Sequence, residues 1–211
     1  MGKIIAFIKV GQKEHIELLQ KEGLLYMNPL GYYRSCEGMS KDKSEGAKEI
    51  LQGRRTKFVI FPHNSQSPSQ IKRVISFEST HTEDLKNNVY CMHTIEDDGV
   101  IINEVNFKRA DYALVIYDCG KFINQLEEFN QKNKLNITYR LVEYVDKDTY
   151  HGPLGCFRKY KEYEHEKEFR ILLEPSEGKT LKLYIGSLQD ISIMVQANEV
   201  TNIIKAKFNL S

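Results

Sequence analysis

The sequence predicts an α+β fold, with a largely antiparallel, strand-rich sheet system and two short helices. Three observations carry this prediction. Many short segments are rich in β-branched and aromatic residues, two segments repeat apolar residues at helical spacing, and the two kinds of segment do not alternate strictly. The length of 211 residues, with 41% hydrophobic and 28% charged residues, predicts a single globular domain over residues 1–211.

The chain begins with a predicted strand, helix and strand. A β-branched and aromatic run over residues 3–10 predicts the first strand. Ile16 and Leu19 then fall at helical spacing before Gly23, a residue suited to a left-handed helix cap, so a short helix is expected here. The apolar run 24–28 predicts the second strand.

The middle of the chain predicts a long loop and then a series of strands. Residues 31–53 are polar and contain several glycines, which predicts a loop of functional character. Strands are expected over residues 56–61, 70–77, 88–95 and 100–105. Asp97-Asp98-Gly99 predicts a hairpin between the last two of these strands.

The second half predicts a buried strand, the clearer helix and several more strands. Residues 111–117 are almost continuously apolar, as in a strand buried on both faces. Asp118 can cap a helix over residues 121–132, where Phe122, Leu126 and Phe129 recur on one face. Further strands are expected over residues 137–145, 169–173, 181–185 and 191–195, followed by a short, partly apolar tail.

Composition excludes several functional classes. Lys and Arg number 30 against 29 Asp and Glu, so no net charge draws the whole molecule to nucleic acid or to an anionic membrane. The apolar run near the start spans five residues, too short for a signal or a membrane span, so we expect a cytoplasmic protein without a membrane partner. The four cysteines show no metal-binding spacing and are expected to be free thiols, and no metal site is predicted.

One candidate site lies at the head of a late strand. Alternation places Phe169, Ile171 and Leu173 on one face of this strand, and Glu166, Glu168 and Arg170 on the other. Such charges form either a solvated edge with a surface ion pair or a polar site beside the core.

A second candidate site surrounds the second strand and the loop after it. Aromatic rings stack on bases or nicotinamide, and an arginine binds phosphate through its planar fork. The alternative is a packed loop that uses tyrosines as half-buried cover. The residues concerned are Tyr26, Asn28, Tyr32, Tyr33, Arg34, Asp42 and Glu45.

Other polar groups carry weaker signals. Cys91 and His93 share a strand face, but a metal site or nucleophilic dyad needs partners that this segment does not offer. The basic clusters at 54–57, 72–73 and 108–109 are typical of solvated turns. The sequence contains no P-loop, no G-x-G-x-x-G, no H-E-x-x-H and no G-x-S-x-G motif, which excludes the enzyme classes that these motifs identify.

The chain resembles a group of uncharacterised bacterial proteins, the domain-of-unknown-function families with a terminal Lys, aromatic, Glu-x-Glu-aromatic-Arg signature. The signature is present here as Lys161, Tyr163, Glu166, Glu168, Phe169 and Arg170. The resemblance extends over residues 7–11, 14–16, 23–28, 32–34, 42–46, 89–92 and 112–116.

In layout the chain also resembles ADP-ribosyltransferases, in particular bacterial toxins that modify nucleic acid. The likeness lies in a strand, a short helix ending in Gly-Leu, a Tyr-bearing strand and a late strand headed by Glu. It implies NAD as cofactor, Glu168 as the residue that holds the ribose 2′-hydroxyl, and Tyr26 or Tyr33 as the ring that stacks on nicotinamide. Where that fold offers His or Arg to the cofactor ribose, this chain has Lys9.

Three functional hypotheses remain open, and whether the protein is an enzyme stays undecided among them. The first is an NAD-dependent ADP-ribosyltransferase-like enzyme in phage defence or toxin activity, with Glu168, Arg170 and Tyr33 as catalytic residues. Its ligand-binding residues would be Lys9, Tyr26, Asn28, Arg34, Asp42 and Glu45. The second is a non-enzymatic module that binds a nucleotide, a nucleic acid or a protein through the 31–53 loop. The third is a metal-dependent nuclease with Asp42, Glu45, Glu166 and Glu168 as magnesium ligands.

Overall fold

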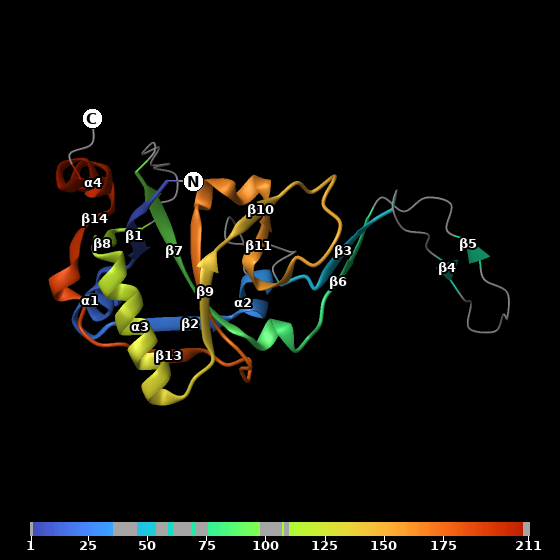
Figure 1. Ribbon diagram of the computed structural model, residues 1–211, viewed down its shortest axis with the longest axis horizontal. Coiled ribbons are helices and arrows are strands. Elements are labelled where there is room, and N and C mark those ends of the chain that lie inside the picture. The colour runs from blue at the N-terminus through green and yellow to red at the C-terminus, as the bar shows by residue number, and fades with distance from the viewer. Residues whose placement is uncertain are drawn as a thin grey trace.

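A computed structural model describes residues 2–35, 46–53, 59–60, 69–70, 76–97, 107 and 110–208, with the backbone alone at 59–60 and 69–70. It contains helices and a mostly antiparallel sheet, so the predicted α+β class is confirmed (Figure 1).

An eight-stranded sheet forms the centre of the fold. Its strand order is β13-β2-β7-β1-β8-β14, with β12 also paired to β7 and β9 paired to β12, and every one of these ladders is antiparallel. The strands are β1 (Ile4–Gly11), β2 (Leu24–Pro29), β7 (Asn88–Glu96), β8 (Tyr112–Ile116), β9 (Ile137–Leu141), β12 (Glu168–Leu173), β13 (Leu181–Tyr184) and β14 (Ser192–Gln196).

Strand β8 illustrates why these segments form the interior of the sheet. Ala113 and Val115 belong to the hydrophobic cluster on one face of the sheet, whereas Leu114 and Ile116 belong to the cluster on the other. All four residues are fully buried, as expected for a continuous apolar run. The predicted central strand is therefore confirmed.

Helices α1 (Lys13–Glu22) and α3 (Cys119–Asn133) pack against one face of the sheet, and both were predicted. Asp118 caps α3 by accepting a hydrogen bond from the backbone nitrogen of Lys121 at 3.0 Å. Gly23 ends α1 with a φ of 65°, and a Cβ there would lie 2.1 Å from the carbonyl oxygen of Gly186. Only glycine fits this junction between α1, β2 and the chain after β13.

The C-terminal segment forms a helix where the sequence predicted a tail. Helix α4 (Val200–Phe208) covers the other face of the sheet. Its buried residues Val200 and Ile204 pack against Ala6, Ile8 and their neighbours. The gain from burying this apolar stripe outweighs the low helix propensity of a β-branched segment.

The predicted 31–53 loop is also partly regular. Helix α2 (Leu30–Ser35) follows β2 directly, and β3 (Glu49–Gln52) pairs with β6 (Ser76–Ser79) as a separate ribbon. Leu30 anchors α2 because its side chain is completely buried. The loop prediction is wrong for these two segments, and residues 36–45 lie outside the described residues.

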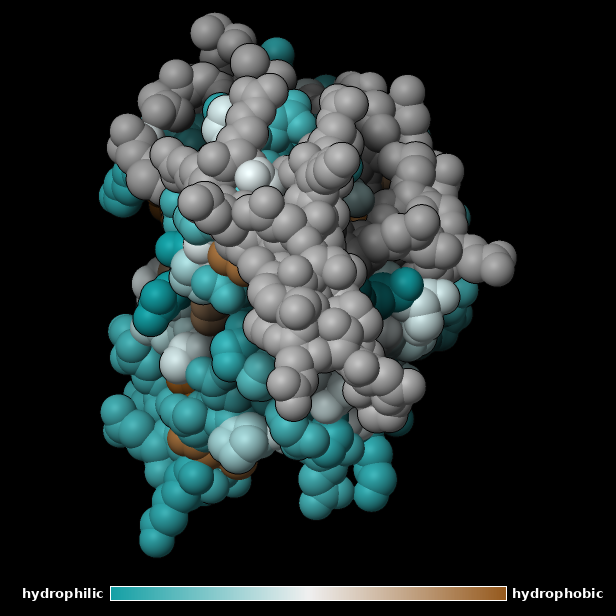
Figure 2. All heavy atoms as spheres, turned by 90° about the vertical axis from the view of Figure 1, so that its right-hand side faces the viewer, coloured by the Kyte–Doolittle hydropathy of each residue, from teal (hydrophilic) through white to brown (hydrophobic). Residues whose placement is uncertain are grey.

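The remaining elements are short. Strand β4 (Val59–Ile60) pairs with β5 (Ser69–Gln70) beyond the β3–β6 ribbon, far from the main sheet (Figure 1). Strands β10 (Glu143–Val145) and β11 (Arg158–Tyr160) form a parallel pair, and single 3-10 turns span Asp84–Lys86, Gly155–Phe157, Lys161–Glu166, Gln189–Ile191 and Ala197–Glu199. On the side of the molecule that carries the ribbon, the described surface is mostly hydrophilic, with small scattered apolar spots (Figure 2).

Several predictions fall only partly within the described residues. The hairpin predicted after β7 involves residues 98–106, which lie outside them, as does most of the segment 54–75 around β4 and β5. Within the described part of the chain, no helix is both long and apolar enough to cross a membrane.

Candidate functional site

The main sheet is split beside its central strand. On one edge β7 pairs with β12 through residues 88–93. On its other edge it pairs with β1 through residues 93–96 and with β2 through residues 88–89. Among the described residues, 90–92 have no strand partner on this second edge. The gap between β1 and β2 therefore leaves a short length of the described β7 backbone without a strand partner on this edge.

Lys9 of β1 occupies this split. Its Nζ donates a hydrogen bond to the carbonyl oxygen of Cys91 at 2.8 Å and lies 4.3 Å from the centre of the Tyr90 ring. The ammonium thus satisfies the β7 carbonyl that no strand reaches. Burial lowers the pKa of Lys9, although the nearby Cys91 and Glu168 oppose this shift. Within the described part of the chain, no carboxylate forms an ion pair with Lys9.

Four charged side chains form a buried network on the other edge of β7; we call Lys159, Glu166, Glu168 and Arg170 the charge network. Arg170 Nε lies 2.8 Å from Glu168 Oε1, and Lys159 Nζ lies 3.0 Å from Glu168 Oε2 and 2.6 Å from Glu166 Oε2. Glu168 is 5% exposed and Arg170 1% exposed. Two cations offset two carboxylates, which is the condition under which such charges can be buried.

The interpretation of these charges as a solvated strand edge is wrong. Strand β12 is not an edge, because β7 and β9 pair with it on both sides. Phe169, Ile171 and Leu173 enter the hydrophobic core, as predicted, so Glu168 and Arg170 lie on the opposite face of a fully enclosed strand. Glu166 belongs to the preceding 3-10 turn and reaches the network from there.

Neighbouring groups hold the network in place. Arg170 donates from Nη1 to the carbonyl oxygen of Cys156, and the backbone nitrogen of Glu168 donates to the Tyr144 hydroxyl at 2.9 Å. The Cys91 side chain also hydrogen-bonds to the Glu168 carboxylate. These contacts connect β12 to β7, to β10 and to the turn before β11.

The network determines how its groups ionise. Burial by itself would raise the pKa of Glu168, but Arg170 and Lys159 outweigh burial and hold this pKa well below its ordinary range. Glu168 is therefore an ionised acceptor rather than a proton donor. For Glu166 burial prevails over Lys159, and its pKa is raised. Burial also raises the pKa of the Cys91 thiol strongly, so this thiol is not an activated nucleophile.

The structure brings four of the predicted site residues together around Cys91. Tyr33 of α2 and Cys91 each pack against the cluster of Leu30, Val89 and Leu172. Lys9 contacts the Cys91 carbonyl, and Glu168 with Arg170 lies beside the Cys91 side chain. Cys91 thus joins the two parts of the site, with its carbonyl toward Lys9 and its thiol toward Glu168.

The other predicted residues lie elsewhere. Tyr26 is 47% exposed. Its ring stacks on that of His15, with ring centres 6.4 Å apart, and also contacts the Lys182 ammonium. The Arg34 guanidinium bonds to Thr80 at 2.8 Å, near the end of the β3–β6 ribbon. Asn28 accepts a hydrogen bond from the Thr180 hydroxyl at 2.9 Å. Tyr32 is half exposed and makes an edge contact with Tyr33, whereas Asp42 and Glu45 lie outside the described residues.

Sequence reasoning missed Lys159, Tyr144 and Tyr90 as members of the site. Lys159 stands among other charged residues, so neither spacing nor composition distinguishes it from an exposed lysine. Within the described residues, no group of three or more His, Cys, Asp or Glu side chains could hold a metal ion.

Comparison with known proteins assigns no family. No family model matches the sequence, and no solved structure matches the fold. The chain is 32% identical to the proteasome component ecm29 of Schizosaccharomyces pombe in an alignment of 106 residues that covers 48% of this chain. The chain covers 6% of that protein.

Replacing Lys159 by Met should destabilise the fold strongly. The substitution leaves the buried carboxylate of Glu168 and the partly buried one of Glu166 with less positive charge beside them, and breaking a buried pair costs about 3–5 kcal/mol. Urea denaturation of both proteins measures the difference. Lys161→Met, an exposed lysine two residues away, is the matched control and should change the free energy of unfolding by less than about 0.5 kcal/mol. Equal effects of the two substitutions would contradict a stabilising network.

His93 should make the protein acid-sensitive. Burial, with help from Lys167 and His165, lowers the pKa of His93 from 6.5 to about 4, even though its Nδ1 donates to the Glu166 carbonyl oxygen at 2.6 Å. Because the unfolded chain takes up this proton at a higher pH than the folded one, stability should fall as the pH drops from 6.5 to about 4. The loss should reach about 3 kcal/mol at most, at about 1.4 kcal/mol per pH unit.

Denaturation curves at several pH values between 7 and 4 measure this slope. His93→Gln should be less stable at neutral pH and should show a flatter pH dependence over this range. The variant keeps the acidic groups, including Glu168, whose lowered pKa makes stability fall only at more acidic pH. A variant with the wild-type slope would rule out His93 as its source.

Proposed function

We propose that this protein binds an anionic nucleotide at the split between β1 and β2, with the Lys9 ammonium against its phosphate groups. The observation that carries the proposal is the half-buried Lys9 ammonium, which is held by a backbone carbonyl and an aromatic ring and has no carboxylate partner among the described residues. A cation withdrawn from water without a counter-ion attracts an anion strongly.

NAD is the first candidate for this nucleotide. Its pyrophosphate suits Lys9, and Tyr33 offers a ring near the same length of β7 on which nicotinamide could stack. The resemblance to ADP-ribosyltransferases favours the same ligand, because it relates Lys9, Tyr33 and Glu168 to the cofactor. These three residues come from β1, α2 and β12, and all three lie around Cys91.

Saturating NAD should raise the Tm of the wild-type protein. At about 100 times the Kd a ligand adds about 2.7 kcal/mol of stability, which for a chain of this size is a shift of several degrees. Lys9→Met should lose this shift because it removes the charge that holds the phosphate. Lys13→Met, at an exposed lysine of α1, should keep it. The proposal fails if NAD gives no shift in the wild type, or an equal shift in the Lys9 variant.

ADP-ribosyl transfer is the reaction that Glu168 favours at this site. Its carboxylate stays ionised, and Arg170, Lys159 and the Cys91 thiol occupy three of its roughly four lone-pair positions, which leaves one for a ribose 2′-hydroxyl. The bond between C1′ and nicotinamide breaks, and its electron pair leaves with neutral nicotinamide. A hydroxyl of the acceptor, or water, then bonds to C1′ and loses its proton. The fixed negative charge stabilises the positive ribose between these events.

Glu168→Gln should lower the release of nicotinamide from NAD by about 10²–10³-fold, the usual cost of removing one electrostatic contact to a transition state. NAD binding should persist, since the phosphate contact is to Lys9. The assay follows nicotinamide with nucleic acid and with protein supplied as acceptors, and Glu164→Gln, an exposed glutamate of the preceding turn, is the control. Wild-type protein that leaves NAD intact with every acceptor would contradict the transferase proposal.

If the wild-type protein does not turn over NAD, the alternative function is that of a binding module. NAD binding without turnover would favour a protein that senses or sequesters nucleotides. A nuclease is less favoured, since Lys159 and Arg170 already neutralise Glu166 and Glu168, two of its expected metal ligands. The similarity to a proteasome component covers too small a share of that protein to propose a partner from it.

A further inference from the structure

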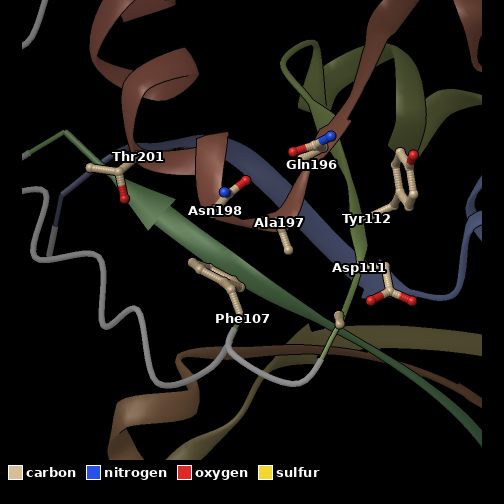
Figure 3. Close-up of a pocket in the computed structure, with 8 residues that line it drawn as sticks. Phe107, Asp111, Tyr112, Gln196, Ala197, Asn198 and Thr201 are labelled. Atoms are coloured by element: carbon tan, nitrogen blue, oxygen red, sulfur yellow. The ribbon is translucent and has the colours of Figure 1, made fainter.

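A pocket of about 570 Å³ lies where β8 begins and β14 ends, beside the first turn of α4 (Figure 3). This volume is within the range of about 300–1,000 Å³ that small-molecule sites occupy. The pocket is separate from Lys9 in its lining residues. These are Phe107, Ala110, Asp111, Tyr112, Gln196, Ala197, Asn198 and Thr201.

The walls of the pocket are set by the main sheet. Tyr112 of β8 lies opposite Gln196 of β14, and the backbone nitrogen of Ala197 donates to the carbonyl oxygen of Asp111 at 3.0 Å. These contacts bind the start of β8 to the end of β14. A ligand would therefore meet walls that already have their shape, which lowers the entropy lost on binding.

Phe107 supplies a fixed aromatic surface. It is 5% exposed, and its ring stands nearly perpendicular to the His93 imidazole, with ring centres 5.5 Å apart. Ala110 and Ala197 pack in the same hydrophobic cluster as this ring and line the pocket beside it. The ring and the alanines form the apolar part of the lining, which suits a flat, weakly polar group.

The polar part of the lining determines which ligand fits. Asn198 presents an amide that both donates and accepts hydrogen bonds, as the edge of a nucleobase requires. Figure 3 shows Asn198 and Phe107 on one side of the pocket, and Asp111 and Tyr112 on the other. Asp111 is the charged side chain among the described residues of the lining. Its carboxylate repels a phosphate and accepts from a ribose hydroxyl or an amino group.

We propose that this pocket binds a nucleoside that carries no phosphate, with its base beside Phe107 and its polar edge on the amide of Asn198. The inference does not depend on the nucleotide site at the split. The two sites differ in charge, since Lys9 attracts a phosphate and Asp111 repels one. Adenosine, AMP and NAD therefore distinguish them.

Isothermal titration of the full chain with adenosine tests the proposal. Wild-type protein should bind adenosine, and AMP should bind at this pocket at least tenfold more weakly. Asn198→Ala should weaken adenosine binding by at least tenfold. Asn202→Ala is the matched control, because Asn202 is an exposed asparagine of α4 outside the lining whose amide bonds to Glu199. It should bind adenosine as the wild type does.

Titrations of Lys9→Met separate this pocket from the split. Adenosine should bind this variant with unchanged affinity, whether or not NAD binds the wild type. The nucleoside proposal is overturned by any of three results: no binding of adenosine at millimolar concentration, equal affinity in Asn198→Ala, or loss of adenosine binding in Lys9→Met. A circular dichroism spectrum equal to that of the wild type shows that each variant is folded.

Discussion

Strand β7 pairs with three strands although it has two edges, and the position of the candidate site depends on this constraint. Strand β12 takes one edge through residues 88–93, and β1 and β2 divide the other. Because β1 and β2 share this edge and leave the described residues 90–92 unpaired on it, the β7 backbone there needs another hydrogen-bond partner. The Lys9 ammonium is that partner for the carbonyl oxygen of Cys91. The cation at the split is thus a consequence of the sheet topology.

The charge network is needed because the fold buries charged side chains of β12. Glu168 and Arg170 are buried on a face of β12 where β10, β11 and the turn before β11 contact them, so their charges have little access to water. Each must find its counter-charge within the protein. Arg170 and Lys159 reach Glu168 from β12 itself and from β11, and Lys159 also neutralises Glu166. The cost of burial explains why these charges are fixed in position, which is also what an electrostatic catalyst needs.

Local patterns predicted the elements whose signal is local. Three of these signals lie within the element they predict, and each prediction was correct. They are the apolar run 112–116, the cap at Asp118 and the glycine at position 23. Helix α4 was missed because its β-branched residues favour a strand, while its helical form depends on burying Val200 and Ile204 against distant strands. Helix α2, with six residues, is too short to show a period.

The candidate site was predictable in part for the same reason. Alternation identified Glu168 and Arg170 as neighbours on one strand face, but their burial depends on contacts with β10, β11 and the turn before β11, which the local pattern does not reveal. Lys9 was named through a resemblance in layout. Tyr33 and Tyr26 were named from the aromatic and charged pattern around the second strand and again from that resemblance, although Tyr26 lies on the surface. Lys159 joins the site only through the fold.

The contact between Phe107 and His93 joins two regions that are distant along the chain. Phe107 lines the pocket, and the ring of His93 bonds to the backbone of Glu166, a member of the charge network. The Phe107 ring therefore links the pocket to the imidazole that bonds to the turn at Glu166. If a ligand in the pocket favours this arrangement of the two rings, thermodynamic linkage requires the arrangement to favour the ligand by the same factor. A substitution that moves His93 would then change the affinity of the pocket for its ligand.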